Sequence, residues 1–190
     1  MKIYTRKGDD GTTGLLYGGR VAKDDLRTQV YGTLDETVSA LGLARGAGLV
    51  ERVEGIVVRI QREMFVVGAQ LATGEKNQHK LKEGVSKVTP GMTERLESEI
   101  DALLEEHPIP NEFILPGETQ GAAALDLARS VVRRAEREAV ALNRAEALPD
   151  PEILRYVNRV SDLLYALARY EEAERGRTAK PSRAEGGKAR

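Results

Sequence analysis

Apolar residues recur along most of the chain at the three- and four-residue spacing that is typical of amphipathic helices. Five stripes of this kind follow one another. They run from Tyr31 to Leu41, from Val53 to Leu71, from Leu96 to Leu104, from Ala124 to Leu142 and from Ile153 to Leu167. Five amphipathic helices with mostly short connections predict an all-α fold, a five-helix antiparallel up-and-down bundle of the ferritin-like kind.

Local signals mark several helix ends. Asp24 or Asp25 can cap the first helix, which is expected to end at about Gly46. The second helix is expected to stop at Gly74 and the third to start near Thr93.

Prolines and acidic residues mark the end of the third helix and the start of the fifth. Pro108 and Pro110 break the chain after the third helix. The fifth has the strongest start signal, because Asp150 supplies a capping carboxylate, Pro151 suits the first turn and Glu152 lies near the positive helix end. On the fourth helix, Val131 and either Leu127 or Ala128 are expected in the apolar stripe.

Three segments lack helical periodicity. Residues 1–23 are glycine-rich and basic, and predict a loop with one short strand at Lys2–Thr5. Residues 75–89 are charged and predict an exposed, mobile loop, and residues 176–190 predict a disordered tail. One domain over residues 1–175 is therefore expected, which suits a chain of 190 residues.

Composition narrows the function classes. The 29 basic and 30 acidic side chains nearly balance, so no overall positive field favours nucleic acid. The chain has no cysteine, which excludes disulfides, thiol catalysis and thiolate metal sites. No apolar run is long enough to span a membrane, and the N-terminus lacks a secretory apolar region, so a cytoplasmic protein without membrane contact is expected.

The N-terminal segment contains the residue types that bind phosphate groups. It contains Thr5-Arg6-Lys7-Gly8 and Thr13-Gly14, with Lys23 at its end. Glycines allow backbone N–H groups to converge, hydroxyls donate hydrogen bonds, and the cations supply charge. It matches neither the Walker loop nor the dinucleotide fingerprint, and from these residues alone a flexible arm is an equal alternative.

A second cluster lies on the fourth helix. Arg129, Arg133 and either Glu136 or Arg137 share one face, apart from the apolar stripe. Arginine geometry favours bidentate binding of phosphate. An ordinary solvated face is the alternative.

The fifth and first helices add polar residues. Asn158 and Asp162 lie one turn apart and could complete a site or bridge helices. Asp35 lies on a face of small residues and could pair with an arginine such as Arg129. Phe113, in the proline-bounded segment 111–117, is either a loop anchor or a surface for a flat apolar ligand.

Taken together, these motifs resemble the PduO-type ATP:cob(I)alamin adenosyltransferases from about Ile3 to Tyr170. Six motifs occur in order: YTRKGDDGTTGL, the R-x-x-K of Arg20–Lys23, YGTLDE, FILPG, RSVVRRAER and NRVSDLLYALARY. Thr37-Val38 departs from the family, which usually has leucine and asparagine there. The resemblance implies a cobalamin adenosyltransferase-like bundle that forms a homotrimer with active sites between subunits.

The resemblance also assigns residues. Those that would bind ATP are Thr5, Arg6, Lys7, Gly8, Thr13, Gly14 and Lys23, together with Arg133, Arg134, Ala135, Glu136, Arg137 and Asn158 from the adjacent subunit. Arg133 would contact the triphosphate, and Glu136 would lie near the Mg²⁺ that accompanies ATP. Those that would hold cobalamin are Asp35, Arg129, Asp162 and Phe113, with Asp35 paired to Arg129 and Phe113 against the lower corrin face.

The implied chemistry fits the residues. Cob(I)alamin is itself a strong nucleophile, so no Ser, Cys or His is needed to attack the 5′ carbon of ATP. Fixed cations orient the reactants and stabilise the leaving triphosphate, and orientation alone can supply about 7–11 kcal/mol of a barrier. Partners implied are an electron-donating reductase and a cobalamin-dependent acceptor enzyme.

Two other function classes also use helical bundles. A bundle that serves only as an interaction or nucleotide-binding module would bind partners through its charged faces. A di-metal carboxylate protein requires glutamate three residues before an inward-facing histidine. Neither His79 nor His107 has that spacing, which disfavours this class.

Overall fold

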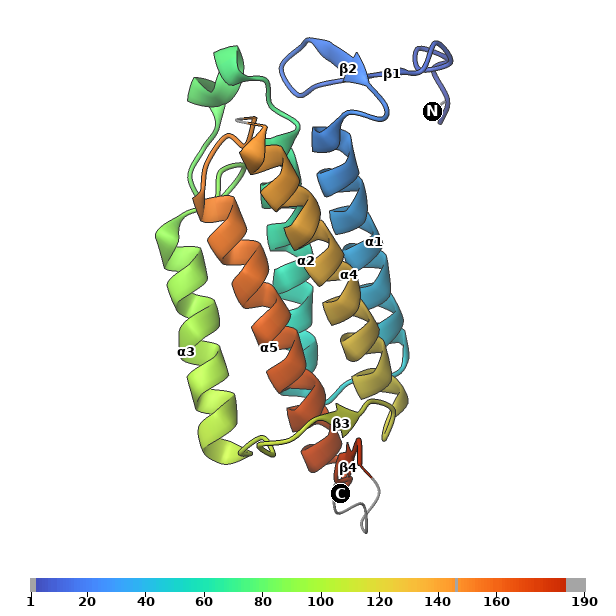
Figure 1. Ribbon diagram of the computed structural model, residues 1–190, viewed down its shortest axis with the longest axis vertical. Helices are drawn as coiled ribbons and strands as arrows, with labels where there is room; N and C mark the ends of the chain where they lie inside the picture. The colour runs from blue at the N-terminus through green and yellow to red at the C-terminus, as the bar shows by residue number, and fades with distance from the viewer. Residues whose placement is uncertain (1–2, 146, 184–190) are drawn as a thin grey trace, which may run out of the picture.

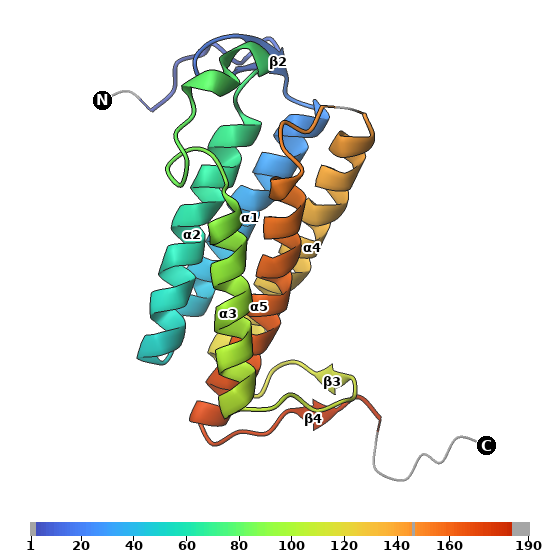
Figure 2. The same cartoon turned by 90° about the vertical axis from the view of Figure 1, so that its left-hand side faces the viewer.

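The computed structural model describes residues 3–145 and 147–183, and its main body is a bundle of five long helices (Figures 1 and 2). The predicted all-α fold is therefore confirmed. The helices are α1 (Leu26–Gly46), α2 (Glu51–Leu71), α3 (Pro90–Glu106), α4 (Gln120–Arg144) and α5 (Glu152–Glu174). None of the helices in the described ranges is both long and apolar enough to cross a lipid bilayer.

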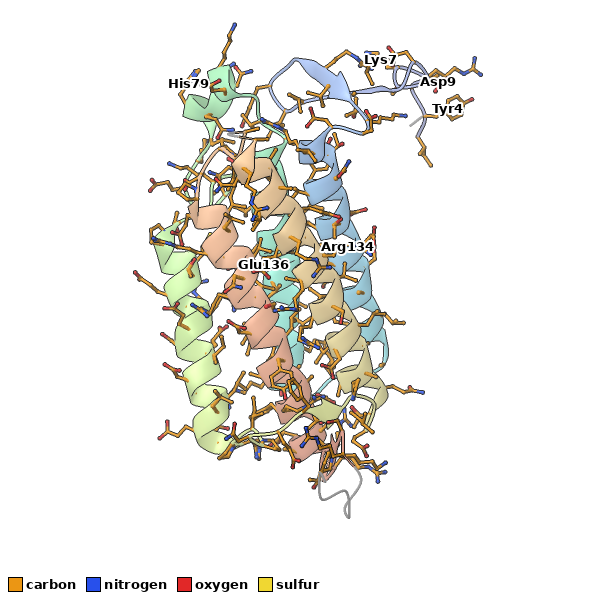
Figure 3. The ribbon with its side chains drawn as sticks, in the orientation of Figure 1. Tyr4, Lys7, Asp9, His79, Arg134 and Glu136 are labelled. Atoms are coloured by element: carbon orange, nitrogen blue, oxygen red, sulfur yellow. The ribbon has the colours of Figure 1, made fainter. Side chains whose placement is uncertain are left out.

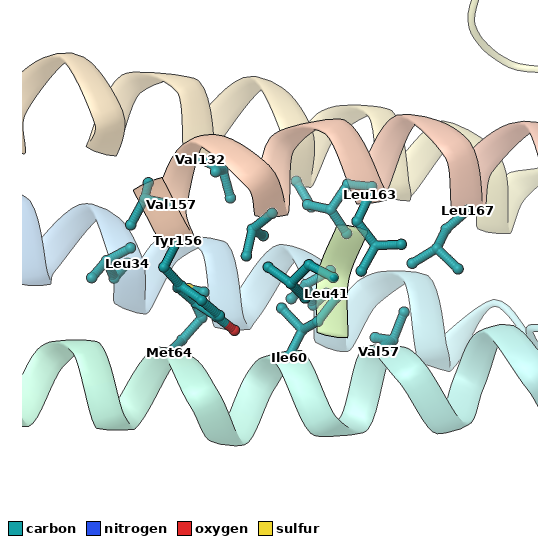
Figure 4. Close-up of a cluster of buried hydrophobic side chains, with 14 of the residues drawn as sticks. Leu34, Leu41, Val57, Ile60, Met64, Val132, Tyr156, Val157, Leu163 and Leu167 are labelled. Atoms are coloured by element: carbon teal, nitrogen blue, oxygen red, sulfur yellow. The ribbon is translucent and has the colours of Figure 1, made fainter. Parts of the chain in front are cut away.

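The core is mainly aliphatic and takes buried residues from all five helices; Figure 4 shows a part of it. Every residue of the predicted α5 stripe is buried; its members are Ile153, Val157, Val160, Leu164 and Leu167. On α4 the stripe takes Ala128, while Leu127 is half exposed. Val132, not the predicted Val131, is fully buried, because the helix turns its Val132 face toward α5 and α1.

The capping signals operate as predicted at two helices. Asp25 accepts a hydrogen bond from the backbone N–H of Arg27 at 2.8 Å and begins α1. The carboxylate of Asp150 accepts from the backbone N–H of Glu152 at 2.9 Å and begins α5. Both caps satisfy backbone donors that lack a partner in the first helical turn.

The prediction for residues 75–89 was wrong in part. Glu75–Lys80 forms a 3₁₀ helix, η1. The Gln78 side chain ties it to α2 by donating to the carbonyl of Gln70 at 3.1 Å. Val88 is buried, and its backbone N–H donates to the Gln70 side chain at 2.8 Å. The third helix begins at Pro90 rather than near Thr93, because proline's fixed φ suits the first helical position.

The N-terminal prediction also needs correction. The described residues 3–5 form no strand, while Lys2 lies outside the described part. Instead, β1 (Thr12–Gly14) and β2 (Arg20–Ala22) form an antiparallel hairpin. Gly18 and Gly19 in its loop have φ of 105° and 94°, values that side chains disfavour.

A second antiparallel strand pair joins distant parts of the chain. β3 (Ile114–Leu115) pairs antiparallel with β4 (Lys180–Pro181) at the end of the bundle opposite β1 and β2 (Figure 2). The tail prediction was therefore wrong for residues 180–181. This segment gains backbone hydrogen bonds from β3, and no local sequence pattern predicts that pairing. Residues 184–190 lie outside the described part.

Candidate active site

A cleft of about 860 Å³ opens between α3, α4, α5 and the segment that leads into β3. Its apolar wall includes Ile100, Leu104 and Ile109. The wall also includes residues that the sequence singled out in three separate motifs: Phe113, Arg129 with Arg133, and Asp162. The fold thus brings three of the four predicted corrin residues, Phe113, Arg129 and Asp162, to one place, while Asp35 does not line this cleft.

Phe113 is 86% exposed in this chain and has no core packing of its own. Its backbone carbonyl accepts a 2.7 Å hydrogen bond from the N–H of Ser182, just beyond β4. The ring is therefore not the anchor of its loop, because backbone hydrogen bonds to the segment at β4 hold the loop in place. This leaves an apolar ring at the edge of the cleft for a flat apolar ligand.

The charged residues of the cleft differ in how they are neutralised. Arg129 Nε lies 3.4 Å from Asp126 Oδ1, and Asp162 Oδ2 accepts from Arg159 at 2.7 Å. Arg133 makes no ion pair with any residue in 3–145 or 147–183. The cleft therefore holds a solvent-accessible guanidinium available to an anionic ligand.

The N-terminal hairpin forms a second cluster of predicted residues. A β-carbon at Gly8 would lie only 3.2 Å from Lys23 Nζ and 3.1 Å from the carbonyl of Thr12, so glycine permits this close approach. Arg20 joins the two halves by donating to the Thr12 hydroxyl and to the carbonyl of Lys7. The hairpin thus places the Lys23 ammonium beside the Gly8 backbone.

Asp10 helps to shape this cluster. It accepts hydrogen bonds from both the backbone N–H and the hydroxyl of Thr12, at 2.9 and 2.8 Å, and these bonds lower the pKa of its carboxyl. A fixed anion here holds Thr12 and Arg20 together and leaves Lys23 as the cation beside Gly8.

The α4 residues predicted to bind nucleotide divide between two sides of the helix. Ala135 is buried in the core, and Arg134 pairs with Glu36 of α1. Glu136 accepts a 2.7 Å hydrogen bond from the side-chain amide of Asn158, which joins α4 to α5. Asn158 therefore bridges helices, and Arg133 and Arg137 remain exposed.

Within one chain the two clusters are far apart. Lys7 lies in the N-terminal segment beyond the end of the bundle, whereas Arg134 and Glu136 lie midway along α4 (Figure 3). Asp35 is exposed on α1, and Arg129 pairs with Asp126 of its own helix rather than with Asp35. A pairing of Asp35 with Arg129 remains a prediction for two neighbouring subunits.

Some cleft residues were missed by sequence reasoning. Ser182 and Arg183 line the cleft from the C-terminal segment, whose sequence shows no periodicity or motif. Ser161 carried a weak signal, since it precedes Asp162 directly. Across residues 3–145 and 147–183, no group of three histidine, aspartate or glutamate side chains is placed to hold a metal ion.

Comparison with known proteins gives a consistent result. The model of the cobalamin adenosyltransferase family matches residues 3–171. A corrinoid adenosyltransferase from Bacillus subtilis is 43% identical over 181 residues, covering 93% of this chain and 89% of that protein. One from Citrobacter freundii is 39% identical over 171 residues, covering 90% of this chain and 95% of that protein.

A solved structure is similar to this chain in both fold and sequence. It is a variant PduO-type ATP:corrinoid adenosyltransferase from Lactobacillus reuteri, complexed with cobalamin and ATP. It superposes with a TM-score of 0.86 at 33% identity, covering 96% of this chain and 97% of that one.

Proposed function

Because the chain belongs to the cobalamin adenosyltransferase family, we propose how its residues transfer the adenosyl group of ATP to a corrinoid. The enzyme is a corrinoid adenosyltransferase of the PduO type. In the proposed reaction, the cobalt of cob(I)alamin attacks the 5′ carbon of ATP. The new cobalt–carbon bond gives adenosylcobalamin, and the broken carbon–oxygen bond releases triphosphate.

One observation carries this proposal: the cleft places an exposed phenylalanine and an unpaired arginine in the same cavity. Phe113 offers a flat apolar surface suited to one face of a corrin ring. Arg133 offers a guanidinium suited to the triphosphate of the nucleotide. A site with both surfaces can hold the two substrates against each other.

The residues act by position and charge. The nucleophile arrives with the substrate, so the protein's task is to align it with the 5′ carbon and to stabilise negative charge on the leaving triphosphate. Arg133 and Arg137 would do this from α4, and the Lys23 ammonium beside Gly8 would do it from the N-terminal hairpin. Phe113 against the lower corrin face would exclude water as an axial ligand and ease reduction of cob(II)alamin.

Magnesium would enter with ATP. Glu136 is half-buried and uses one carboxylate oxygen, Oε1, to accept from Asn158 at 2.7 Å. The second oxygen can face a cation, and a carboxylate is a ligand that Mg²⁺ prefers. One carboxylate fits a metal held mainly by phosphate oxygens and does not form a metal cage.

The proposed assembly is a homotrimer with an active site at each subunit boundary. The separation of Lys7 from Arg134, the neighbour of Arg133, within one chain supports it, because a neighbouring copy can supply the missing half (Figure 3). We further propose a cytoplasmic enzyme that receives its electron from a reductase and delivers adenosylcobalamin to an acceptor enzyme.

The direct test mixes the protein with ATP, Mg²⁺ and chemically reduced cobalamin and follows the visible spectrum. We expect light-sensitive adenosylcobalamin to form with release of one triphosphate per product. Omission of ATP should abolish the spectral change. If neither adenosylcobalamin nor triphosphate formed with the intact chain, the proposed reaction would be wrong.

A further inference from the structure

A buried ionic cluster lies behind the cleft, between α4 and α5. Arg169 donates to Asp126 Oδ2 at 2.7 Å and to Glu172 Oε1 at 3.0 Å. The side chains of Arg169, Asp126 and Glu172 are only 5%, 7% and 2% exposed. Charges this deeply buried are retained in proteins when they are paired.

The charges within this cluster do not balance by themselves. Two carboxylates, of Asp126 and Glu172, face one guanidinium, that of Arg169. Burial, together with the charge of Asp126, raises the pKa of the Glu172 carboxyl. The second cation is Arg129, whose Nε lies 3.4 Å from Asp126 Oδ1 and whose side chain reaches the cleft.

Tyr165 links the cluster to the cleft a second time. The guanidinium carbon of Arg169 lies 5.3 Å from the centroid of its ring, and that of Arg129 lies 5.7 Å from it. Both distances are within the range of cation–π attraction. Tyr165 and Arg129 both line the cleft, so the buried cluster determines where two wall side chains lie.

The other end of the cluster reaches the loop that follows β3. The Glu172 carboxylate adjoins this loop, where the backbone N–H of Glu118 partly offsets the rise in its pKa. The Glu118 carboxylate in turn lies 3.1 Å from Lys180 Nζ of β4. The strand pair that holds Phe113 is therefore tied to the same buried charges as Arg129.

We propose that Asp126, Arg169 and Glu172 are positioning residues that set the corrin-binding wall of the cleft, acting through Arg129, Tyr165 and the β3 loop. The inference rests on the proposed function of the cleft. None of the three needs to touch substrate. Their charge balance fixes the Arg129 guanidinium and the Tyr165 ring before the corrin arrives, which lowers the ordering needed on binding.

The test compares the two substrates separately in Asp126→Asn and Arg169→Lys variants. Asp126→Asn keeps the shape but removes the charge that holds Arg129, and Arg169→Lys removes the planar group beside Tyr165. We expect the KM for reduced corrinoid to rise about tenfold, equivalent to about 1.4 kcal/mol. The KM for ATP should change less than about twofold, because neither Arg133 nor Lys23 forms an ion pair with this cluster within the described residues.

A matched control separates positioning from stability. Tyr156→Phe removes another buried hydrogen bond, that of Tyr156 Oη to Glu63 Oε2 at 2.6 Å, and neither residue lines the cleft. We expect this variant to lose thermal stability while keeping both KM values. Glu172→Gln serves as a further variant if Arg169→Lys does not fold, and should raise the corrinoid KM selectively as well.

The outcomes distinguish the two levels of the proposal. An inactive wild type would contradict the proposed function itself. Suppose that the wild type is active and that the cluster variants lose stability, like Tyr156→Phe, but keep the corrinoid KM. The cluster would then have only a structural role, and this inference would be overturned. Equal changes in both KM values would also overturn it, because a wall of the corrin site would not discriminate in that way.

Discussion

At the scale of single residues, charge pairing divides the α4 arginines into different roles. Arg129 pairs with Asp126, and Arg134 pairs with Glu36. Arg133 makes no ion pair within the described ranges, although it lies in the same cleft as Phe113. An exposed cation without a carboxylate partner can neutralise charge on a leaving group at little cost in protein contacts.

The Arg133→Ala variant should therefore lose turnover while remaining folded. Loss of one fixed charge-stabilising donor typically lowers kcat about 10²–10³-fold. We expect helical content and assembly to stay unchanged by circular dichroism and sedimentation, since Arg133 is exposed. Arg62→Ala, which removes another exposed arginine on α2, is the control and should keep full kcat. A fully active Arg133→Ala would contradict the phosphate-binding role.

At the scale of elements, periodicity is the reason that the helices were predictable. The α5 stripe repeats over more than four turns and its start carries Asp150 and Pro151, so both its face and its origin follow from sequence. The 3₁₀ helix η1, the β1–β2 hairpin and the β3–β4 strand pair have no such apolar repeat. β3 and β4 are two residues each, and they exist because segments about 65 positions apart meet after the bundle has formed.

The candidate site shows the same division. Motifs identified Phe113, Arg129 and Asp162, and the cleft contains all three. Arg183 lines the cleft because β4 pairs with β3, and no local sequence pattern predicts that pairing. The charge-balanced cluster around Arg169 was equally hidden, because residues on α4 and α5 must first be brought together by the core.

Removal of the C-terminal strand tests what β4 contributes. Deletion of residues 179–190 abolishes the Ser182–Phe113 backbone bond and the Lys180–Glu118 ion pair. A hydrogen bond contributes about 0.5–1.5 kcal/mol, so corrinoid affinity should fall on the order of tenfold. The melting temperature should change little, because both strands lie outside the helical core. Titration with cob(II)alamin measures the first effect and calorimetry the second.

A shorter deletion provides the comparison. Removal of residues 184–190 leaves β4 and Ser182 in place and should preserve corrinoid affinity. If both deletions left affinity unchanged, β4 would have no part in positioning Phe113. If both lowered it equally, the effect would belong to the residues after Arg183 rather than to the strand.

At the scale of the whole molecule, one chain presents two half sites. The N-terminal hairpin lies beyond one end of the bundle (Figures 1 and 3). The lining of the cleft includes Phe113, Ile114 and Arg183, which lie at or next to β3 and β4 at the other end. Neither half suffices for the proposed reaction, since the nucleotide's phosphates and the corrin must meet. The proposed ring of identical subunits would solve this, because each boundary would join the hairpin of one copy to the α4 face of the next.

Subunit mixing tests this arrangement. Lys23→Ala removes the hairpin cation and Arg133→Ala removes the α4 cation, so each pure variant should be nearly inactive. In randomly mixed trimers from equal amounts, about a quarter of the boundaries join an intact hairpin to an intact α4 face, so about a quarter of wild-type activity should return. The measurement is adenosylcobalamin formation after co-expression of the two chains with different affinity tags.

A matched pair makes the result specific to the boundary. Arg133→Ala mixed with Arg137→Ala places both defects on the α4 face, so no boundary is intact and activity should not return. Recovery in this pair too would indicate exchange unrelated to site geometry. Absence of recovery in the Lys23→Ala and Arg133→Ala pair, with mixed trimers verified by both tags, would instead place the hairpin and the arginine in the same subunit's site. The hairpin would then have to fold back along its own bundle when ATP binds, since Lys7 and Arg134 lie apart in one chain (Figure 3).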